Sequence, residues 1–184
     1  DKMEDPTGVV DYVTTLTNDI FVASEVAINL SIAGFLPITV PDETYTLDLH
    51  TLMEDAESPF SNIDEDLLSF RGDVAVLIRA PAPLEDDGFC GWADLGVVDN
   101  YFNLNEDRAV VDWKPRGNGT YCYDITFTHE IGHLLGARHN RSSESKIGAY
   151  SYSYAYLSDT FATVMAVSSD HGSIKIPRIS NPNL

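Results

Sequence analysis

The stretch from His129 to His139 reads HEIGHLLGARH, and it decides both the fold and the chemistry expected of this chain. It follows the pattern H-E-x-x-H-x-x-G-x-x-H, which places three imidazoles, one carboxylate and one glycine at the spacing of a catalytic zinc site. Three of the five histidines in the 184 residues lie within this stretch. A bare H-E-x-x-H occurs by chance, but the further glycine and histidine at fixed offsets make a chance match improbable.

The spacing predicts how these residues are arranged in space. Residues four apart lie on one face of an α-helix, so His129 and His133 can bind one ion together. Glu130 lies about 100° further round the helix than His129, which suits a general base better than a metal ligand. Gly136 allows the helix to end in a left-handed conformation, after which His139 can approach as a third ligand from outside the helix. Three protein ligands leave one tetrahedral position open, as in catalytic zinc sites.

We expect the helix that carries this motif to span residues 124–135, with Asp124 as an N-cap or first-turn acid. Its apolar residues recur at helical spacing and should face a core. They are Phe127, Ile131, Leu134 and Leu135.

Composition indicates one globular domain, with 43% hydrophobic and 22% charged residues. The net charge of −18 is unevenly distributed, because residues 1–70 carry fifteen acids and only one base. Such an acidic surface argues against nucleic acid and anionic membrane as partners. No apolar run approaches the ~20 residues of a membrane span. The first residues do not form a signal peptide, so a secreted protein would be present here in processed form.

Two acidic clusters, at residues 64–66 and 85–87, could hold calcium. Neither has the spaced ligands of a calcium loop, so we interpret both as solvated surface.

The chain has two cysteines, Cys90 and Cys122, which most simply form one disulfide. It would connect the loop around Cys90 to the start of the zinc helix. Two buried free thiols, or one thiol acting as a latent zinc ligand, remain as alternatives.

Periodicity predicts the remaining elements. Helices are expected over residues 9–23, 45–55 and 63–70, and strands over 26–32, 74–78, 92–98 and 108–113, with the strand at 74–78 fully buried. This order predicts an α/β sandwich in which the zinc helix lies across the sheet and an irregular C-terminal part lies beneath the cleft.

With these features the chain resembles the metzincin zinc endopeptidases. Besides the zinc motif, Thr163-Val164-Met165-Ala166 resembles their methionine turn, with Met165 beneath the metal; its alternative is an ordinary core methionine. The resemblance implies a twisted, mostly parallel sheet with an antiparallel edge strand, an active-site helix and a small irregular C-terminal subdomain. Residues 1–184 would form one catalytic domain, with an upper part at 1–139 and a lower part at 140–184.

Among metzincins the chain is most similar to reprolysin-like secreted bacterial enzymes, including the peptidyl-Asp metalloendopeptidases. Three features depart from relatives: Asn140 replaces an aspartate, Val167 excludes a tyrosine ligand at that position, and the chain ends at Leu184, where relatives continue into a helix. The resemblance further implies that the edge strand at 92–98 pairs with an extended substrate. The residues it would use are Trp92, Ala93, Asp94, Leu95 and Gly96.

These features together predict a secreted, monomeric endopeptidase that binds one zinc ion and hydrolyses proteins with a zinc-activated water, Glu130 being the general base. A preference for aspartate on the primed side would need a cation near the scissile bond. The alternative is that the basic residues from residue 71 onward are scattered surface charges. His171 could assist near the cleft. The cationic candidates are Arg138, Arg141, Lys146, Lys175 and Arg178.

Two other functions compete with this prediction. One is a zinc-binding or adhesion module without catalysis, against which the retained Glu130 argues. The other is a zinc hydrolase of small amides, which a comparison of casein with short peptides would distinguish.

Overall fold

The computed structural model describes residues 3, 5–40, 44–80, 89–95, 97–98, 101–102, 107–113, 122, 124–143, 148–167 and 173–181, to which all structural statements refer. Its helices and strands are α1 (Pro6–Ala23), α2 (Thr46–Glu54), α3 (Ile63–Phe70), β1 (Ala75–Arg79), β2 (Gly91–Ala93), β3 (Val97–Val98), β4 (Tyr101–Phe102), β5 (Arg108–Asp112), α4 (Thr126–Leu134), β6 (Arg138–Asn140), β7 (Tyr154–Ala155), β8 (Phe161–Ala162) and β9 (Ile174–Lys175). No helix in this described part is long and apolar enough to cross a membrane.

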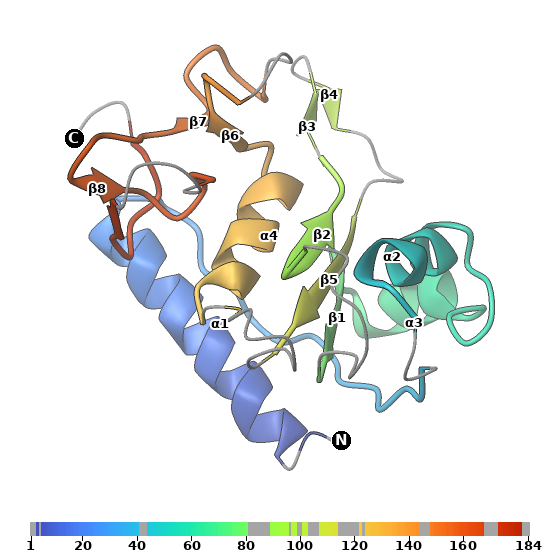
Figure 1. Ribbon diagram of the computed structural model, residues 1–184. Helices are drawn as coiled ribbons and strands as arrows, with labels where there is room; N and C mark the ends of the chain where they lie inside the picture. The colour runs from blue at the N-terminus through green and yellow to red at the C-terminus, as the bar shows by residue number, and fades with distance from the viewer. Residues whose placement is uncertain are drawn as a thin grey trace.

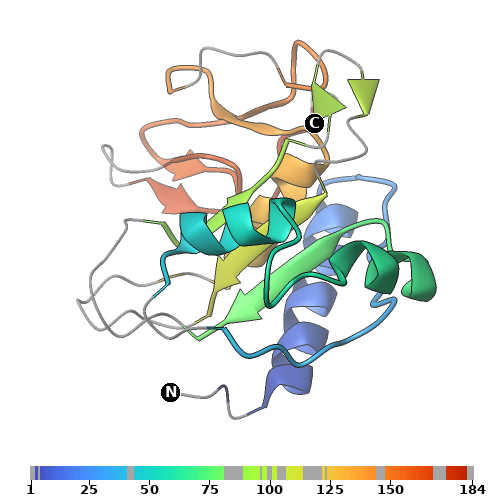
Figure 2. The same ribbon diagram turned by 90° about the vertical axis from the view of Figure 1, so that its right-hand side faces the viewer.

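A mixed α/β architecture surrounds a three-stranded sheet in the order β1-β5-β2. Strand β1 is parallel to β5, and β2 is antiparallel to β5 at the edge. Helices α1 and α4 lie on one side of the sheet and α2 and α3 on the other (Figure 1). The view in Figure 2 shows α2 across the front of the strands and α1 behind them. The predicted α/β class and the antiparallel edge strand are both present.

The two faces of β5 supply two separate hydrophobic clusters. Ala109 and Val111 pack with α1 and with Phe127 and Ile131 of α4. Val110, which points to the opposite face, packs with residues of α2. This alternation follows from the two-residue period of a strand. The sheet therefore provides a rigid surface against which α4, the helix of the zinc motif, is fixed.

The strand predicted over residues 26–32 is not formed. The backbone of Leu30 instead pairs with a side chain, because its N–H donates to Asn18 Oδ1 at 2.7 Å and its carbonyl accepts from Asn18 Nδ2 at 2.9 Å. Val26 and Leu30 still pack against the core. Ile28 and Ile32, which the same alternation placed on the buried face, are 43% and 44% exposed, so the strand pairing was predicted wrongly and the burial only in part. Without this strand, the described sheet has one parallel and one antiparallel pairing and not the parallel majority that we expected.

The edge strand is shorter than predicted. In place of one strand over 92–98, β2 ends at Ala93, and Val97–Val98 pairs with Tyr101–Phe102 in a separate two-stranded sheet. The cause lies in Asp94, which is 8% exposed and accepts a hydrogen bond from the Arg108 backbone N–H at 3.1 Å. Because the Asp94 side chain accepts the Arg108 N–H, this backbone donor is no longer available for regular strand pairing, and the pairing of β2 with β5 ends there.

Smaller differences concern α4 and β1. The N-cap of α4 is Ile125, without a side-chain hydrogen bond, and Asp124 instead accepts from the Tyr12 hydroxyl at 2.7 Å. Leu135 lies at the C-cap and is 41% exposed, outside the apolar face. Strand β1 is mostly half-buried and not fully buried.

The predicted disulfide between Cys90 and Cys122 is present, with their Cα atoms 5.2 Å apart. It connects the residue before β2 to the segment that leads into α4. Strand β2 and α4 are thereby covalently connected close to the zinc motif.

Replacing both cysteines by serine is expected to lower the free energy of unfolding by about 3–4 kcal/mol, because the bridge closes a loop of 32 residues. Denaturant unfolding of the double variant and of oxidised and reduced wild type measures the difference. Equal stability of all three would contradict a structural role for the bridge.

Candidate metal centre and active site

The three motif histidines converge on one point. The Nε2 atoms of His129 and His133 are 3.1 Å apart, and that of His139 lies 3.2 Å from His129 and 3.1 Å from His133. These three side chains form a group that could hold a metal ion. Bonds of 2.0–2.1 Å to a tetrahedral zinc would place its nitrogen ligands about 3.3 Å apart. The arrangement thus fits the size of a divalent metal such as zinc.

Backbone carbonyls orient two of the rings. Nδ1 of His129 donates to the Val164 carbonyl at 2.9 Å, and Nδ1 of His133 donates to the Ala137 carbonyl at 2.9 Å. A proton on Nδ1 leaves the Nε2 lone pair free for a metal. Three such lone pairs at contact distance repel one another unless a cation lies between them, so the donor set itself indicates a metal.

Burial keeps these imidazoles neutral. It holds the pKa of His129 well below its usual value, with the neighbouring His133 contributing in the same direction. Burial, reinforced by the charge of His139, lowers the pKa of His133 to about 4. Neutral imidazoles are the form that binds metal, so protons compete weakly with a metal at neutral pH.

The third histidine reaches the site through the turn that the motif predicts. Gly136 has φ 84°, in the left-handed region, directly after the end of α4. The chain then enters β6, which carries His139 and runs parallel to β7. Asn140, one of the noted departures, is 6% exposed and its Oδ1 accepts from the Val167 N–H at 3.1 Å. An amide at this position therefore connects the third histidine to the segment after Met165.

Met165 lies against the helix that carries the histidines. It is 1% exposed, and a Cβ added at Gly132 would come within 2.3 Å of its sulfur. Only a residue without a side chain allows α4 to approach the methionine this closely. Met165 also packs with Ala155, Ala162 and Ala166 in the core of the C-terminal part. A methionine turn at this position stays a prediction, and the sequence motif gave no reason to single out Gly132.

Glu130 lies on the same helix with its carboxylate inside the protein. Its side chain is 4% exposed, and burial raises its pKa to about 8, against the opposing effect of the Lys175 charge. A cation bound nearby favours the ionised form of such a carboxylate. The carboxylate lies against the edge strand, because a Cβ added at Gly91 would be 2.5 Å from Glu130 Oε1. Sequence reasoning missed this role of Gly91, whose contact partner is 39 positions away in the chain.

Gly91→Ala is expected to lower kcat/KM by about a hundredfold without loss of bound metal, because the added methyl group must displace the Glu130 carboxylate. Peptidase assays together with metal analysis measure both effects. Gly72→Ala, which adds the same methyl group after α3 on the other side of the sheet, is the matched control. Full activity of Gly91→Ala would mean that catalysis does not require the Glu130 carboxylate to lie against residue 91.

The proposed substrate-contacting residues divide into two groups. Trp92 and Ala93 belong to β2, and Leu95 follows it half-buried. Asp94 points inward and is already bonded to Arg108. Gly96 lies outside the described residues, as do Lys146, His171 and the acidic residues 85–87. Asp64 and Glu65 are exposed, Asp66 is half-buried, and Asp64 pairs with Arg108.

A second polar cluster, not anticipated from the sequence, lies on the other side of the sheet. His50 is 2% exposed, with Nδ1 3.3 Å from Glu54 and Nε2 3.2 Å from Asp94. Burial alone would lower the pKa of His50, but the hydrogen bond and charge of Asp94 and the charge of Glu54 raise it. The group could hold a cation, but both ring nitrogens already face acceptors. We therefore interpret it as an ionic contact that fixes α2 to the end of β2.

The described cationic candidates differ in their surroundings. Arg141 lies over the Tyr154 ring at 4.2 Å and donates to the Ser151 carbonyl. Arg178 donates to the Ala23 carbonyl at the end of α1, and Arg138 is only 6% exposed. Lys175 donates to the Val164 carbonyl at 3.2 Å, and its charge acts on Glu130. Of these four, Lys175 combines partial exposure with proximity to the expected base.

Comparison with known proteins decides the family. Residues 5–184 match the family model described as "Metallo-peptidase family M12B Reprolysin-like". The chain belongs to this reprolysin-like metallopeptidase family. The predicted resemblance and the predicted enzyme class are thereby confirmed at the level of the family, and the family implies a metal, for which the histidine group is suited.

Reprolysin-like relatives include two proteins named peptidyl-Asp metalloendopeptidase. One, from Stenotrophomonas maltophilia (strain R551-3), is 26% identical over 183 residues, and one from Xanthomonas campestris pv. campestris is 25% identical over 179 residues. Each alignment covers 96% of this chain and 40% of the relative. The chain thus spans less than half the length of these relatives.

A solved structure has a fold similar to that of this chain. It is described as "Structure of a chaperone-substrate complex", and the superposition gives a TM-score of 0.64 at 20% identity. It covers 95% of this chain and 25% of the other. At this identity the likeness concerns the fold alone.

Proposed function

We propose that this chain is the catalytic domain of a secreted zinc endopeptidase that cleaves proteins bound in extended form. The observation that carries the proposal is the convergence of three Nε2 atoms beside a buried glutamate that lies against a sheet edge. His129, His133 and His139 would hold the metal, and zinc suits a site of three neutral imidazoles.

The division of chemistry follows from the positions of the groups. When bound, the metal polarises the scissile carbonyl and acidifies the attacking water. Glu130 accepts the proton of that water on its carboxylate and later delivers it to the leaving amine. Its burial supports this role, because a carboxylate with a raised pKa is a stronger base when ionised and can return the proton near neutral pH.

The substrate is proposed to add a strand to β2. This strand forms one edge of the three-stranded sheet, and its first residue contacts the Glu130 carboxylate. A peptide that pairs with such an edge is fixed by main-chain hydrogen bonds, which are independent of sequence. Trp92, Ala93 and Leu95 are the residues we assign to this contact, with Asp94 holding the strand end from inside.

We further propose a preference for aspartate on the primed side of the scissile bond. The relatives are named for peptidyl-Asp cleavage, and the part of the chain from residue 71 onward supplies ten of its eleven basic residues. Secretion is supported by the disulfide, which persists in oxidising compartments. We also propose that the catalytic domain consists of an upper part at 1–139 and a lower part at 140–184, and that the protein is a monomer.

Metal analysis combined with casein digestion tests the proposed function. Wild type is expected to contain one zinc per chain and to cleave casein. Cleavage should stop when the zinc is removed by a chelator and resume when zinc is restored. Zinc binding without any cleavage would favour the non-catalytic module. Cleavage of short amides but not of casein would favour the small-amide hydrolase.

A further inference from the structure

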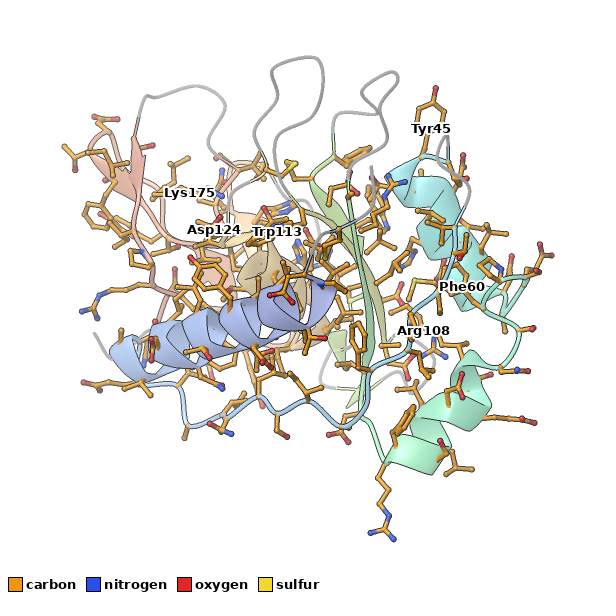
Figure 3. All side chains as sticks on the ribbon, turned by 90° about the horizontal axis from the view of Figure 1, so that it is seen from below. Tyr45, Phe60, Arg108, Trp113, Asp124 and Lys175 are labelled. Carbon is orange, nitrogen blue, oxygen red and sulfur yellow. A yellow bond between two sulfur atoms is a disulfide. The ribbon has the colours of Figure 1, made fainter. Side chains whose placement is uncertain are left out.

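Lys175 occupies a place that the metal site does not explain. It lies in β9, on the side of the C-terminal segment that faces α4 (Figure 3). Its Nζ donates to the Val164 carbonyl at 3.2 Å, and the same carbonyl accepts from Nδ1 of His129 at 2.9 Å. The ammonium is therefore held directly behind one of the three converging imidazoles.

Within the described part of the chain, the charge of Lys175 is incompletely compensated. Its amine has three donors, of which the Val164 carbonyl takes one. Among the described residues no carboxylate lies within ion-pair distance of it, and the acid whose charge it affects is Glu130. Burial lowers the pKa of Lys175, which reflects the cost of a partly buried ammonium. Such a group binds an additional anion favourably.

Its location indicates where that anion would come from. The shared Val164 carbonyl places the Lys175 ammonium next to His129, and the substrate residues on either side of the scissile bond would lie around the metal that His129 is expected to hold. The other described cations are less suitable, because Arg141 and Arg178 donate to carbonyls elsewhere and Arg138 is almost fully buried.

We propose that Lys175 selects substrates by binding the carboxylate of an acidic side chain, aspartate in the first instance, on the primed side of the scissile bond. This inference rests on the proposed endopeptidase function. Aspartate has the shortest acidic side chain, and its carboxylate supplies the negative charge and the acceptors for the two Lys175 donors that have no acceptor among the described residues.

A different role for Lys175 would be to favour the ionised form of Glu130. That role would change cleavage of every substrate by the same factor, whereas charge selection changes the ratio between an acidic and a neutral substrate. Two peptides that differ only by Asp or Asn after the scissile bond separate the roles, because effects on the metal and on Glu130 cancel in the ratio of their kcat/KM values.

The experiment compares wild type, Lys175→Met, Lys175→Arg and the control Arg141→Gln. Lys175→Met retains the length of the side chain and removes its charge. It is expected to reduce the Asp/Asn ratio about tenfold to a hundredfold, the usual effect of one charge-assisted hydrogen bond. Lys175→Arg should retain most of the ratio and Arg141→Gln all of it. Zinc content and thermal unfolding identify a variant that has failed to fold.

A binding measurement gives a second readout without turnover. In the Glu130→Ala background, the Asp peptide should bind more tightly than the Asn peptide, and adding Lys175→Met should abolish that difference. An unchanged Asp/Asn ratio in Lys175→Met, or an equal fall for both peptides with a shifted pH profile, would overturn the inference and leave the proposed function intact. Cleavage of neither peptide and of no protein by wild type would overturn both.

Discussion

Glu130→Ala is expected to retain its zinc and to lose about a thousandfold or more of the peptidase kcat/KM, because the variant lacks the carboxylate that we propose takes the proton of the attacking water. Glu130 is not one of the three converging metal ligands, so its removal should leave the imidazoles in place. Folding should not suffer, since the variant removes a carboxylate whose burial raises its pKa to about 8. We therefore expect Glu130→Ala to be at least as stable as wild type, because a buried carboxylate is costly.

Casein cleavage and zinc content, measured together on both proteins, test this expectation. Glu65→Ala is the matched control, because Glu65 is an exposed glutamate in the first turn of α3. Cleavage at the wild-type rate by Glu130→Ala would remove the residue from the mechanism. Fragment masses from wild type reveal in the same experiment whether new N-termini begin with aspartate.

His139→Ala is expected to lower zinc affinity by more than about a hundredfold and to abolish cleavage at ordinary zinc concentrations. Two imidazoles on α4 would remain at 3.1 Å from each other, but the ligand that closes the group from β6 would be missing. Because this variant loses activity through its metal, high zinc should restore part of the cleavage, which it should not do for Glu130→Ala.

Competition with a chelator of known affinity measures the zinc dissociation constant. The matched control is His50→Ala, which removes a histidine that is 2% exposed and lies on the other side of the sheet. This control should lose stability and keep one zinc per chain. Retention of wild-type affinity by His139→Ala would show that the three-imidazole site is wrong.

Several features could be predicted because they depend on residues close together in the sequence. Helices α1, α2 and α3 have bounds close to the predicted ranges, since each has apolar residues at helical spacing. The same applies to the end of α4 at Gly136, where the left-handed φ of 84° follows from a glycine at that offset. The family resemblance predicted an antiparallel edge strand before β5, and the strand is present at Gly91–Ala93.

Other predictions failed where a distant group took over a backbone hydrogen bond. Asn18 binds both backbone groups of Leu30 and replaces a strand partner that the alternating pattern implied. Asp94 accepts from the Arg108 N–H and ends the edge strand early. Periodicity indicates which face of a segment is apolar, but it does not identify what a backbone group pairs with.

The sequence by itself determined the donor set and its local geometry, because His129, Glu130, His133, Gly136 and His139 lie within α4, the turn that ends it and the strand β6 that follows directly. Tertiary structure alone decided what surrounds that set. It brings Gly91 against the Glu130 carboxylate, Met165 against Gly132 and the Lys175 ammonium beside the carbonyl that orients His129. Gly91 and Glu130 are 39 positions apart, Gly132 and Met165 33, and His129 and Val164 35. Only the packing of α4 against the sheet and the C-terminal segment determines such distances.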